Sequence, residues 1–372
     1  MIILLWVVLT PLVLGLLGLG LYFLKAIVQG TIEGWRSGSV SPEDEAAAAL
    51  LAERLGTLGL LPAERQNTEL AAPLEPALTV ALADARAGDW KPAAALLDET
   101  AAARDWERRS FLAGQLGIAA AEEDAWLTAW ESARPDDPGA ALVRARGTVQ
   151  LAWKLRGAKR ARYTTAEQAA GFHRTLPLAD EQHVRAAALA PQDDPTPYIG
   201  EMWSAIGLGR GHDEMHRIWK EITGRAPHHY EAHWTALQFW CAKWRGSEEL
   251  ARAFAVRAAA EAPTGSLMTV FPLIAHFEHD KSDTTDVDRT PEMYAAVDAL
   301  LADIAAADPA HPRLPEARHL AAYFLNLQGR WDEAVEQFRQ VDGHVGVLPW
   351  SYRANPAEHY CFTRDECVAN AS

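Results

Sequence analysis

A short pattern that recurs along the chain limits its fold more than any other feature of the 372-residue sequence. Two distant copies share a glycine, a tryptophan two positions later, then an alanine and a large apolar residue; they run from Gly88 to Leu97 and from Gly329 to Phe338. Degenerate copies follow Asp213 and Glu248. The glycine would end one helix, and the aromatic face of the next helix would pack back against it. Each such hairpin leaves an apolar face that only a neighbouring hairpin can cover.

The rest of the sequence predicts the same fold class. From about residue 74 onward, helical patterns follow one another between short Pro and Gly breaks, and no run alternates with the period of a strand. We therefore expect an all-α fold. The expected organisation is an anchor at 1–28, a linker with a short helix at 29–73, a helical-repeat domain at 74–345 and a C-terminal tail at 346–372.

These repeats resemble the tetratricopeptide-like superfamily. The best matching unit runs from Leu314 to Val341, in which G-R-W-D-E-A-V-E-Q-F reads like the second-helix signature of that superfamily, and we expect Trp331 and Phe338 to pack on the preceding helix. The region 140–280 resembles an uncharacterised bacterial domain family through A-W-K-L-R-G after Leu151 and K-W-R-G-S after Ala242. The resemblance implies a helical-hairpin solenoid and no assigned activity, so it carries over no functional residue.

The N-terminal segment is apolar enough to cross a membrane. No charged side chain occurs from Met1 to Leu24, and about 20 apolar residues suffice for a helix that spans the bilayer. Trp6 lies near one end of this run, and Tyr22 and Lys25 near the other, as interfacial residues do. A cleaved signal peptide is the alternative, but no basic residue precedes the run and no Ala-x-Ala site follows it. We expect a retained anchor that contacts the lipid bilayer through residues 1–28.

Few residues indicate the orientation of this anchor. Lys25 and Arg36 follow the apolar run, and only the amino group of the chain precedes it. The positive-inside rule then places the large domain in the cytoplasm. A count of three cysteines agrees with a reducing compartment.

The chain is acidic and has one basic run. Its formal net charge of −15 argues against general nucleic-acid binding. A solvated, internally paired helix face is the simplest interpretation of the run. The functional alternative is contact with anionic lipid headgroups. The basic residues are Arg144, Arg146, Lys154, Arg156, Lys159, Arg160 and Arg162.

Histidines are concentrated between positions 212 and 233. His212 and His216 are four positions apart, and so are His229 and His233, so each pair would share one helix face. Histidines at this spacing can bind zinc. Neither pair belongs to an H-E-x-x-H motif, and helix caps and surface histidines among packed tryptophans explain them as well. A metal-dependent enzyme remains the alternative hypothesis, and we predict that these residues bind no metal.

Two further groups of residues are weak candidates for a metal site. Five residues separate Cys361 from Cys367, more than structural zinc sites prefer, so a docked tail is expected there. An acidic loop contains Asp280, Asp283, Asp286 and Asp288 but lacks the glycine and the distal glutamate of an EF-hand. The start of a helix at Thr290-Pro291-Glu292 explains its end.

No motif indicates an enzyme. Gly207-Leu208-Gly209-Arg210-Gly211 has no preceding strand and no following G-K-(S/T), so a hairpin turn is expected. The tryptophans between 203 and 244 are expected in the core. We predict no catalytic residue and no cofactor. The expected function is that of a membrane-tethered scaffold that binds a protein or peptide partner.

Overall fold

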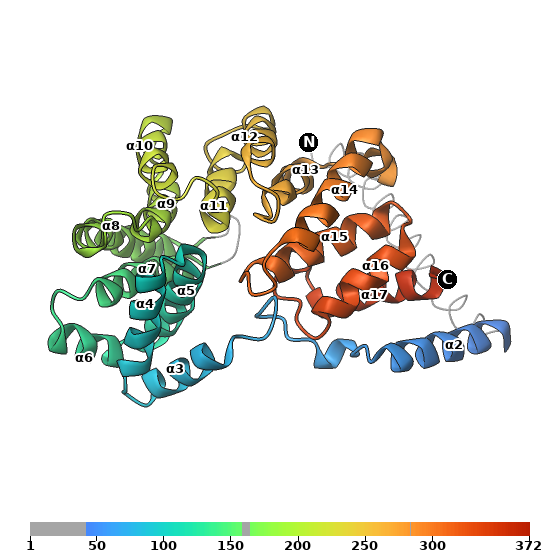
Figure 1. Ribbon diagram of the computed structural model, residues 1–372, viewed down its shortest axis with the longest axis horizontal. Helices are drawn as coiled ribbons and strands as arrows, with labels where there is room; N and C mark the ends of the chain where they lie inside the picture. Colours follow the sequence, from blue (N-terminus) through green and yellow to red (C-terminus); the bar gives the residue numbers. More distant parts are fainter. Residues whose placement is uncertain (1–41, 158–163, 283) are drawn as a thin grey trace, which may run out of the picture. The chain divides into compact units, whose positions relative to one another are not determined.

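The structure, a computed structural model, describes residues 42–157, 164–282 and 284–372 (Figure 1). These ranges consist of α-helices and short 3-10 helices, with one isolated β-bridge between Asn67 and His344 and no strand. The predicted all-α class is therefore confirmed for the described part of the chain.

The chain divides into two compact units, Met1–Gly59 and Leu60–Ser372. The described helix of the first unit is α2 (Pro42–Leu58), whose described side chains are largely exposed. By length and composition, the segment Glu45–Arg65 could cross a membrane, although a signal sequence would pass the same test. The adjacent charges of Glu53 and Arg54 lie within it. The anchor predicted at 1–28 lies outside the described residues.

The second unit contains fifteen α-helices within the described ranges. The first eight are α3 (Pro76–Arg86), α4 (Lys91–Ala103), α5 (Trp106–Glu122), α6 (Ala125–Ala133), α7 (Pro138–Arg156), α8 (Ala166–Leu189), α9 (Thr196–Leu208) and α10 (His212–Thr223). The others are α11 (Tyr230–Trp240), α12 (Glu248–Glu261), α13 (Phe271–His279), α14 (Pro291–Ala306), α15 (Leu314–Leu327), α16 (Trp331–Val341) and α17 (Pro356–Asn370). Helices that are consecutive in sequence pack on each other along the unit, including α3 on α4, α7 on α8, α9 on α10 and α15 on α16.

Local sequence sets the ends of many of these helices. Thr165 forms a capping box with Gln168 at the start of α8, and the hydroxyl of Thr290 accepts a hydrogen bond from the backbone N–H of Met293 at the start of α14. Gly88 after α3 and Gly329 after α15 have φ angles of 94° and 71°. Because L-residues with side chains rarely adopt such angles, these glycines end the first helix of each hairpin as the repeated pattern predicts.

The hairpin of α15 and α16 tests the predicted register. Phe338 is completely buried, and its ring lies 5.3 Å from Tyr360 and 6.1 Å from Trp350. Trp331 is partly buried against the same core. The predicted burial of Phe338 is confirmed, and much of its contact comes from the C-terminal segment.

Buried apolar residues form one large core from α9 to α17, a second one within α3–α7 and a small third one between α7 and α8. The core position predicted for the central tryptophans is confirmed for Trp240 and only in part for the other four. Trp240 is buried, and the others pack against the core while keeping part of their surface exposed; they are Trp203, Trp219, Trp234 and Trp244.

The ends of the second unit are joined to each other. The backbone N–H of Asn67 donates to the carbonyl of Gly343 at 2.8 Å, and the N–H of Val345 donates to the carbonyl of Asn67 at 2.7 Å. The guanidinium of Arg364 in α17 donates to the carbonyl of Leu61 at 2.7 Å. Residues 60–73 of the predicted linker and residues 346–372 of the predicted tail therefore both lie in this compact unit, where their polar groups pair with each other.

Candidate functional site

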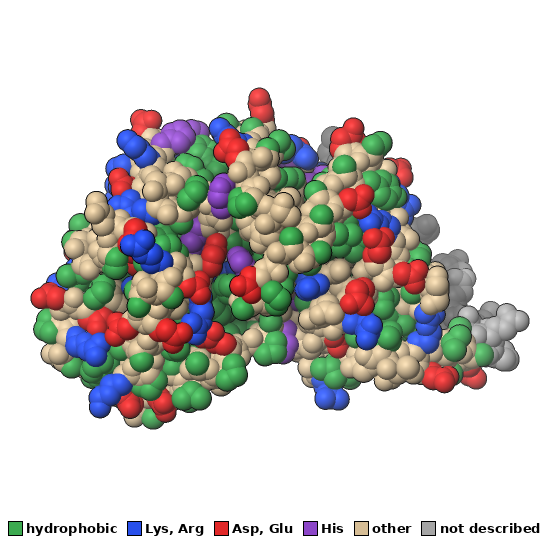
Figure 2. All heavy atoms as spheres, in the orientation of Figure 1, with side chains coloured by type: hydrophobic (Ala, Val, Ile, Leu, Met, Phe, Trp, Pro, Cys, Tyr) green, Lys and Arg blue, Asp and Glu red, His purple; other side chains and the backbone are tan. Residues whose placement is uncertain are grey.

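A cavity of about 340 Å³, here called the inner pocket, opens on the middle helices of the second unit. Its apolar walls come from Trp203 of α9, Trp234 of α11, Ile274 of α13 and Leu320 of α15, and the segment 346–352 covers one side. Figure 2 shows that the middle of the face it presents is hollowed. Alternate helices thus supply side chains to one surface.

A buried ion-pair network forms the floor of the inner pocket. Glu231 accepts hydrogen bonds from the guanidinium groups of Arg146 and Arg313 and from the hydroxyl of Ser110. Burial raises the pKa of the Glu231 carboxyl, but the charges of Arg146 and Arg313 outweigh it and lower the pKa to about 2. Arg313 also pairs with Glu316 at 2.6 Å. The network joins α5, α7, α11 and the start of α15, and its charge is fixed at neutral pH.

The rim of the inner pocket is aromatic. The rings of Trp203 and Trp234 lie 5.7 Å apart. At the opposite edge, the hydroxyl of Tyr352 donates to Glu278 at 2.8 Å, and the ammonium of Lys243 lies 2.7 Å from the same carboxylate. These contacts hold exposed Tyr352 against the pocket, so its wall is built before any ligand arrives.

A second cavity, of about 500 Å³, adjoins the inner pocket. It is lined by residues 69–75, by Arg108 and Phe111 of α5 and by residues 309–316. Arg313, Glu316 and Gly346 line both cavities. The two cavities therefore meet at the Arg313–Glu316 pair, which lies where a long ligand would pass from one to the other.

A third cavity, of about 490 Å³, is named the histidine pocket and lies among α10, α11 and α12. Four histidines line it together with Trp219, Trp240 and Phe254; they are His212, His216, His228 and His233. His212 contacts the carbonyl of Arg245 through Nε2 at 2.8 Å, and the His216 ring lies 5.3 Å from the Trp240 ring.

Three of the four histidines that the sequence singled out line the histidine pocket, whereas the fourth, His229, does not. His229 caps α11 by accepting from Ala232, and its Nε2 lies 3.1 Å from the carbonyl of Trp106 in α5. His233 is buried between the rings of Trp219 and Phe254. The interpretation of these side chains as caps and packed rings agrees with every contact described for them.

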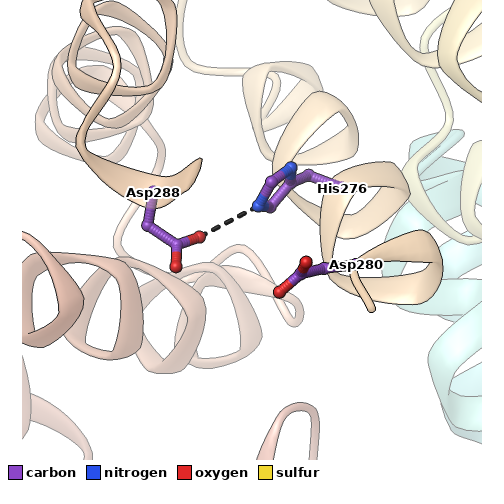
Figure 3. Close-up of side chains that lie close together, drawn as sticks. All are labelled: His276, Asp280 and Asp288. Carbon is purple, nitrogen blue, oxygen red and sulfur yellow. Dashed lines mark hydrogen bonds and ion pairs between the residues drawn. The ribbon is translucent and has the colours of Figure 1, made fainter. Parts of the chain in front are cut away.

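A different histidine approaches two carboxylates. Figure 3 shows His276 at the end of α13 facing Asp288, with Asp280 beside them. His276 Nε2 lies 2.9 Å from Asp288 Oδ1, and one possible ligand atom from each of the three residues lies within 4.8 Å of the others. His276 and Asp288 are buried, whereas Asp280 is exposed. These three residues are called the His–Asp cluster below.

The acidic loop expected from the sequence includes Asp280 and Asp288 but not His276. A signal for it was present, because His276 and Asp280 are four positions apart and such residues share one face of a helix. Asp286 is exposed and lies outside the cluster, and Asp283 lies outside the described residues. The contact of Asp288 with His276 depends on the path of the loop between them, which sequence spacing alone does not predict.

Two members of the predicted basic run are paired within the protein. Arg144 forms ion pairs with Asp124 at 2.5 Å and Glu131 at 2.6 Å. Arg146 is buried and pairs with Glu231. These ion pairs fit the interpretation of internal pairing for these two residues.

The other basic residues of the run lie at the end of α7 or after it in the sequence. Lys154 is exposed, and the guanidinium of Arg156 lies 5.4 Å from the centre of the Trp153 ring. Contact of this end of the run with anionic lipid stays a prediction. Three of its residues lie outside the described ranges; they are Lys159, Arg160 and Arg162.

The three cysteines are buried thiols. Cys361 and Cys367 both lie in α17, which packs on α16, so the predicted docked tail is an ordered helix. Burial raises the pKa of both thiols to about 11 and that of Cys241 to about 12. Since the thiolate is the reactive form, these residues are poor nucleophiles at neutral pH.

Comparison with known proteins does not narrow the function. No protein-family model, no curated protein and no solved structure matches this chain.

Proposed function

We propose that this chain is a membrane-tethered helical-repeat scaffold whose inner pocket binds an extended segment of a partner protein. Its fold would be a tetratricopeptide-like solenoid of helical hairpins, with α3 and α4 as the first hairpin and α15 and α16 as the last. The glycine-ended helix pairs and the order in which consecutive helices pack support this fold. The inner pocket is the observation that carries the proposed function.

The walls of the inner pocket suit a peptide better than a small polar metabolite. Trp203, Trp234 and Leu320 offer apolar surface for a large side chain, and aromatic walls of this kind are frequent at binding surfaces. The Arg313–Glu316 pair offers both a donor and an acceptor to the backbone of an extended segment. The adjoining second cavity provides room for the segment to continue.

The tether is proposed from the sequence. The uncharged run from Met1 to Leu24 is long enough to span a bilayer, and Lys25 and Arg36 favour a cytoplasmic location for the second unit. A carbonate wash of membranes tests the tether: the full-length chain should stay with the membrane fraction. Its release by carbonate would contradict a spanning anchor.

Site-specific photocrosslinking in cells tests the inner pocket. A photoreactive phenylalanine analogue placed at Trp234 or Trp203 of the full-length chain should give the same crosslinked partner. The matched control places the analogue at Val256, which is 60% exposed on α12 and outside the pocket lining. We expect no such product from the control. Equal crosslinking from Val256, or none from either tryptophan position, would rule out binding at the inner pocket.

A competing enzymatic function has less support. A metal-dependent enzyme built on His212, His216, His229 and His233 needs these side chains to converge, and His229 contacts α5 instead. In the alternative of anionic-lipid binding through the basic run 144–162, Arg144 and Arg146 pair internally, and Lys159, Arg160 and Arg162 lie outside the described residues. Binding of a partner segment therefore remains the proposal that the described residues favour.

A further inference from the structure

We propose that the His–Asp cluster, His276, Asp280 and Asp288, binds a divalent transition-metal ion of the Zn²⁺ type. This site is independent of the inner pocket and of the function proposed for it. Figure 3 shows the imidazole and the two carboxylates directed toward one another.

The separations between the ligand atoms are close to those of a coordination shell. Zinc binds imidazole nitrogen and carboxylate oxygen at about 2.0–2.2 Å, so neighbouring ligand atoms in a tetrahedral site lie roughly 3.4 Å apart. His276 Nε2 and Asp288 Oδ1 are 2.9 Å apart, and all three ligand atoms lie within 4.8 Å of each other. Closing the shell requires a small movement of Asp280, whose exposed carboxylate follows the last residue of α13.

Electrostatics favour a cation at this position. Asp288 is 4% exposed, and a buried carboxylate is costly unless a positive charge or hydrogen-bond donors compensate it. Its ion-pair partner is the His276 imidazole, which carries a positive charge only when protonated. Asp280 brings a second carboxylate within 4.8 Å of the same place. A divalent cation neutralises both carboxylates and leaves the imidazole neutral, as metal ligation requires.

The ligand types select the class of metal. An imidazole with two carboxylates suits Zn²⁺ and related divalent transition metals, whereas Ca²⁺ requires six to eight oxygen ligands and Mg²⁺ prefers oxygen. Three protein ligands leave a fourth position for water, as in zinc sites that are open to solvent. The exposure of Asp280 gives solvent access to that position.

The bound ion would fix the connection between two helices. His276 lies in α13, Asp280 follows that helix, and Asp288 lies in the 3-10 helix Thr285–Arg289 before α14. The carbonyl of Asp288 also accepts from Gln328 at 3.1 Å, which ties this turn to the end of α15. Coordination would therefore cross-link the acidic loop to the packed helices on both sides.

Direct titration with zinc tests the proposal. Full-length protein in detergent is stripped with a chelator, dialysed and titrated with ZnCl₂ against a chromophoric competitor. We expect one tight equivalent for each chain. Asp280→Asn and Asp288→Asn should each raise the dissociation constant by about 100-fold, since each removes a ligand. Because Asp280 is exposed, the D280N variant decides the test even if D288N does not fold.

Two control variants identify where zinc binds. Asp286→Asn removes an exposed carboxylate of the same loop, and His216→Gln removes an exposed imidazole of the histidine pocket. Both should keep the affinity of the unsubstituted chain. Absence of tight zinc binding, its persistence in D280N or its loss in H216Q would each overturn the proposal.

Discussion

The histidine pocket and the His–Asp cluster lie in the same compact unit and place histidine in opposite surroundings. In the histidine pocket, the His233 ring lies 4.9 Å from Trp219 and 5.8 Å from Phe254, and its Nδ1 lies 2.9 Å from the carbonyl of His229. In the cluster, His276 faces carboxylates. The histidine pocket uses its histidines for packing, whereas the His–Asp cluster places one imidazole and two carboxylates within 4.8 Å of one another. An imidazole that faces two carboxylates therefore favours a metal site more than a large number of neighbouring histidines does.

The largest effect that this comparison predicts is a loss of stability in mild acid. Burial is the main cause that lowers the pKa of His233 to about 4, and it outweighs a hydrogen bond to the backbone of His229 that raises this pKa. Burial likewise lowers the pKa of His319 to about 4, and burial together with Arg146 lowers that of His183 to about 3. These folded-state values lie below the unfolded value of about 6.5, so the unfolded chain binds more protons.

The stability contributed by these neutral histidines is present above pH 6.5 and is lost as the pH falls toward 4. Each histidine should lower the free energy of unfolding by about 1.4 kcal/mol for each pH unit in this window. Urea unfolding at pH 7.5, 6 and 5 measures the effect. The variant His233→Phe should show a shallower decline, because one of the three proton-binding groups is gone. An equal decline in both proteins would show that His233 titrates normally and is not a packed neutral ring.

The second prediction separates packing from ligation in the histidine pocket. His233→Ala leaves a cavity among Trp219, Phe254 and Phe271 and should cost about 3 kcal/mol of unfolding free energy. His233→Phe keeps a ring there and should recover most of that loss at pH 7.5. Denaturant unfolding of the two variants checks this. If the phenylalanine variant were as unstable as the alanine variant, ring packing would not explain His233.

The third prediction concerns the stability of the His–Asp cluster. A ligand that binds only the folded state at ten times its dissociation constant stabilises by about 1.4 kcal/mol. Zinc at that concentration should raise the free energy of unfolding of the unsubstituted chain by this amount and leave D280N unchanged. Chemical denaturation with zinc and with a chelator measures the difference. An equal gain in D280N would place the stabilising ion elsewhere.

The sequence predicts the helices far better than it predicts the sites. The spacing of Gly329, Trp331 and Phe338 correctly placed a hairpin and a buried ring, since helix periodicity and a glycine stop are local properties. The pairing of Asn67 with residues 343–345 could not be predicted, because it joins segments about 280 positions apart through backbone groups that any residue has. For the same reason, no local signal indicates that residues 60–73 and 346–372 share one compact unit with the helices.

The same distinction between local and long-range contacts explains which site residues could be predicted from the sequence. Glu231 gave no sequence signal, although it contacts Arg146, Arg313 and Ser110 from three other parts of the chain. At His229, the spacing from His233 left a shared ligand face open as an alternative to the predicted cap. Its side chain instead caps its own helix and reaches the carbonyl of Trp106 on α5. Sequence spacing predicts that two residues share one helix face. The contacts of that face depend on the helix that packs against it.

The smallest predicted effect is that of replacing His216, and it tests whether the histidine pocket binds zinc. His216 is exposed on α10, and its ring lies 5.3 Å from the ring of Trp240 at the edge of the cavity. Exposed substitutions away from caps, cavities and buried networks usually change stability by less than about 0.5 kcal/mol. His216→Gln should therefore leave the free energy of unfolding within that range, with or without zinc. If zinc stabilised the unsubstituted chain and failed to stabilise H216Q, His216 would be a ligand, and the histidine pocket rather than the His–Asp cluster would be the metal site.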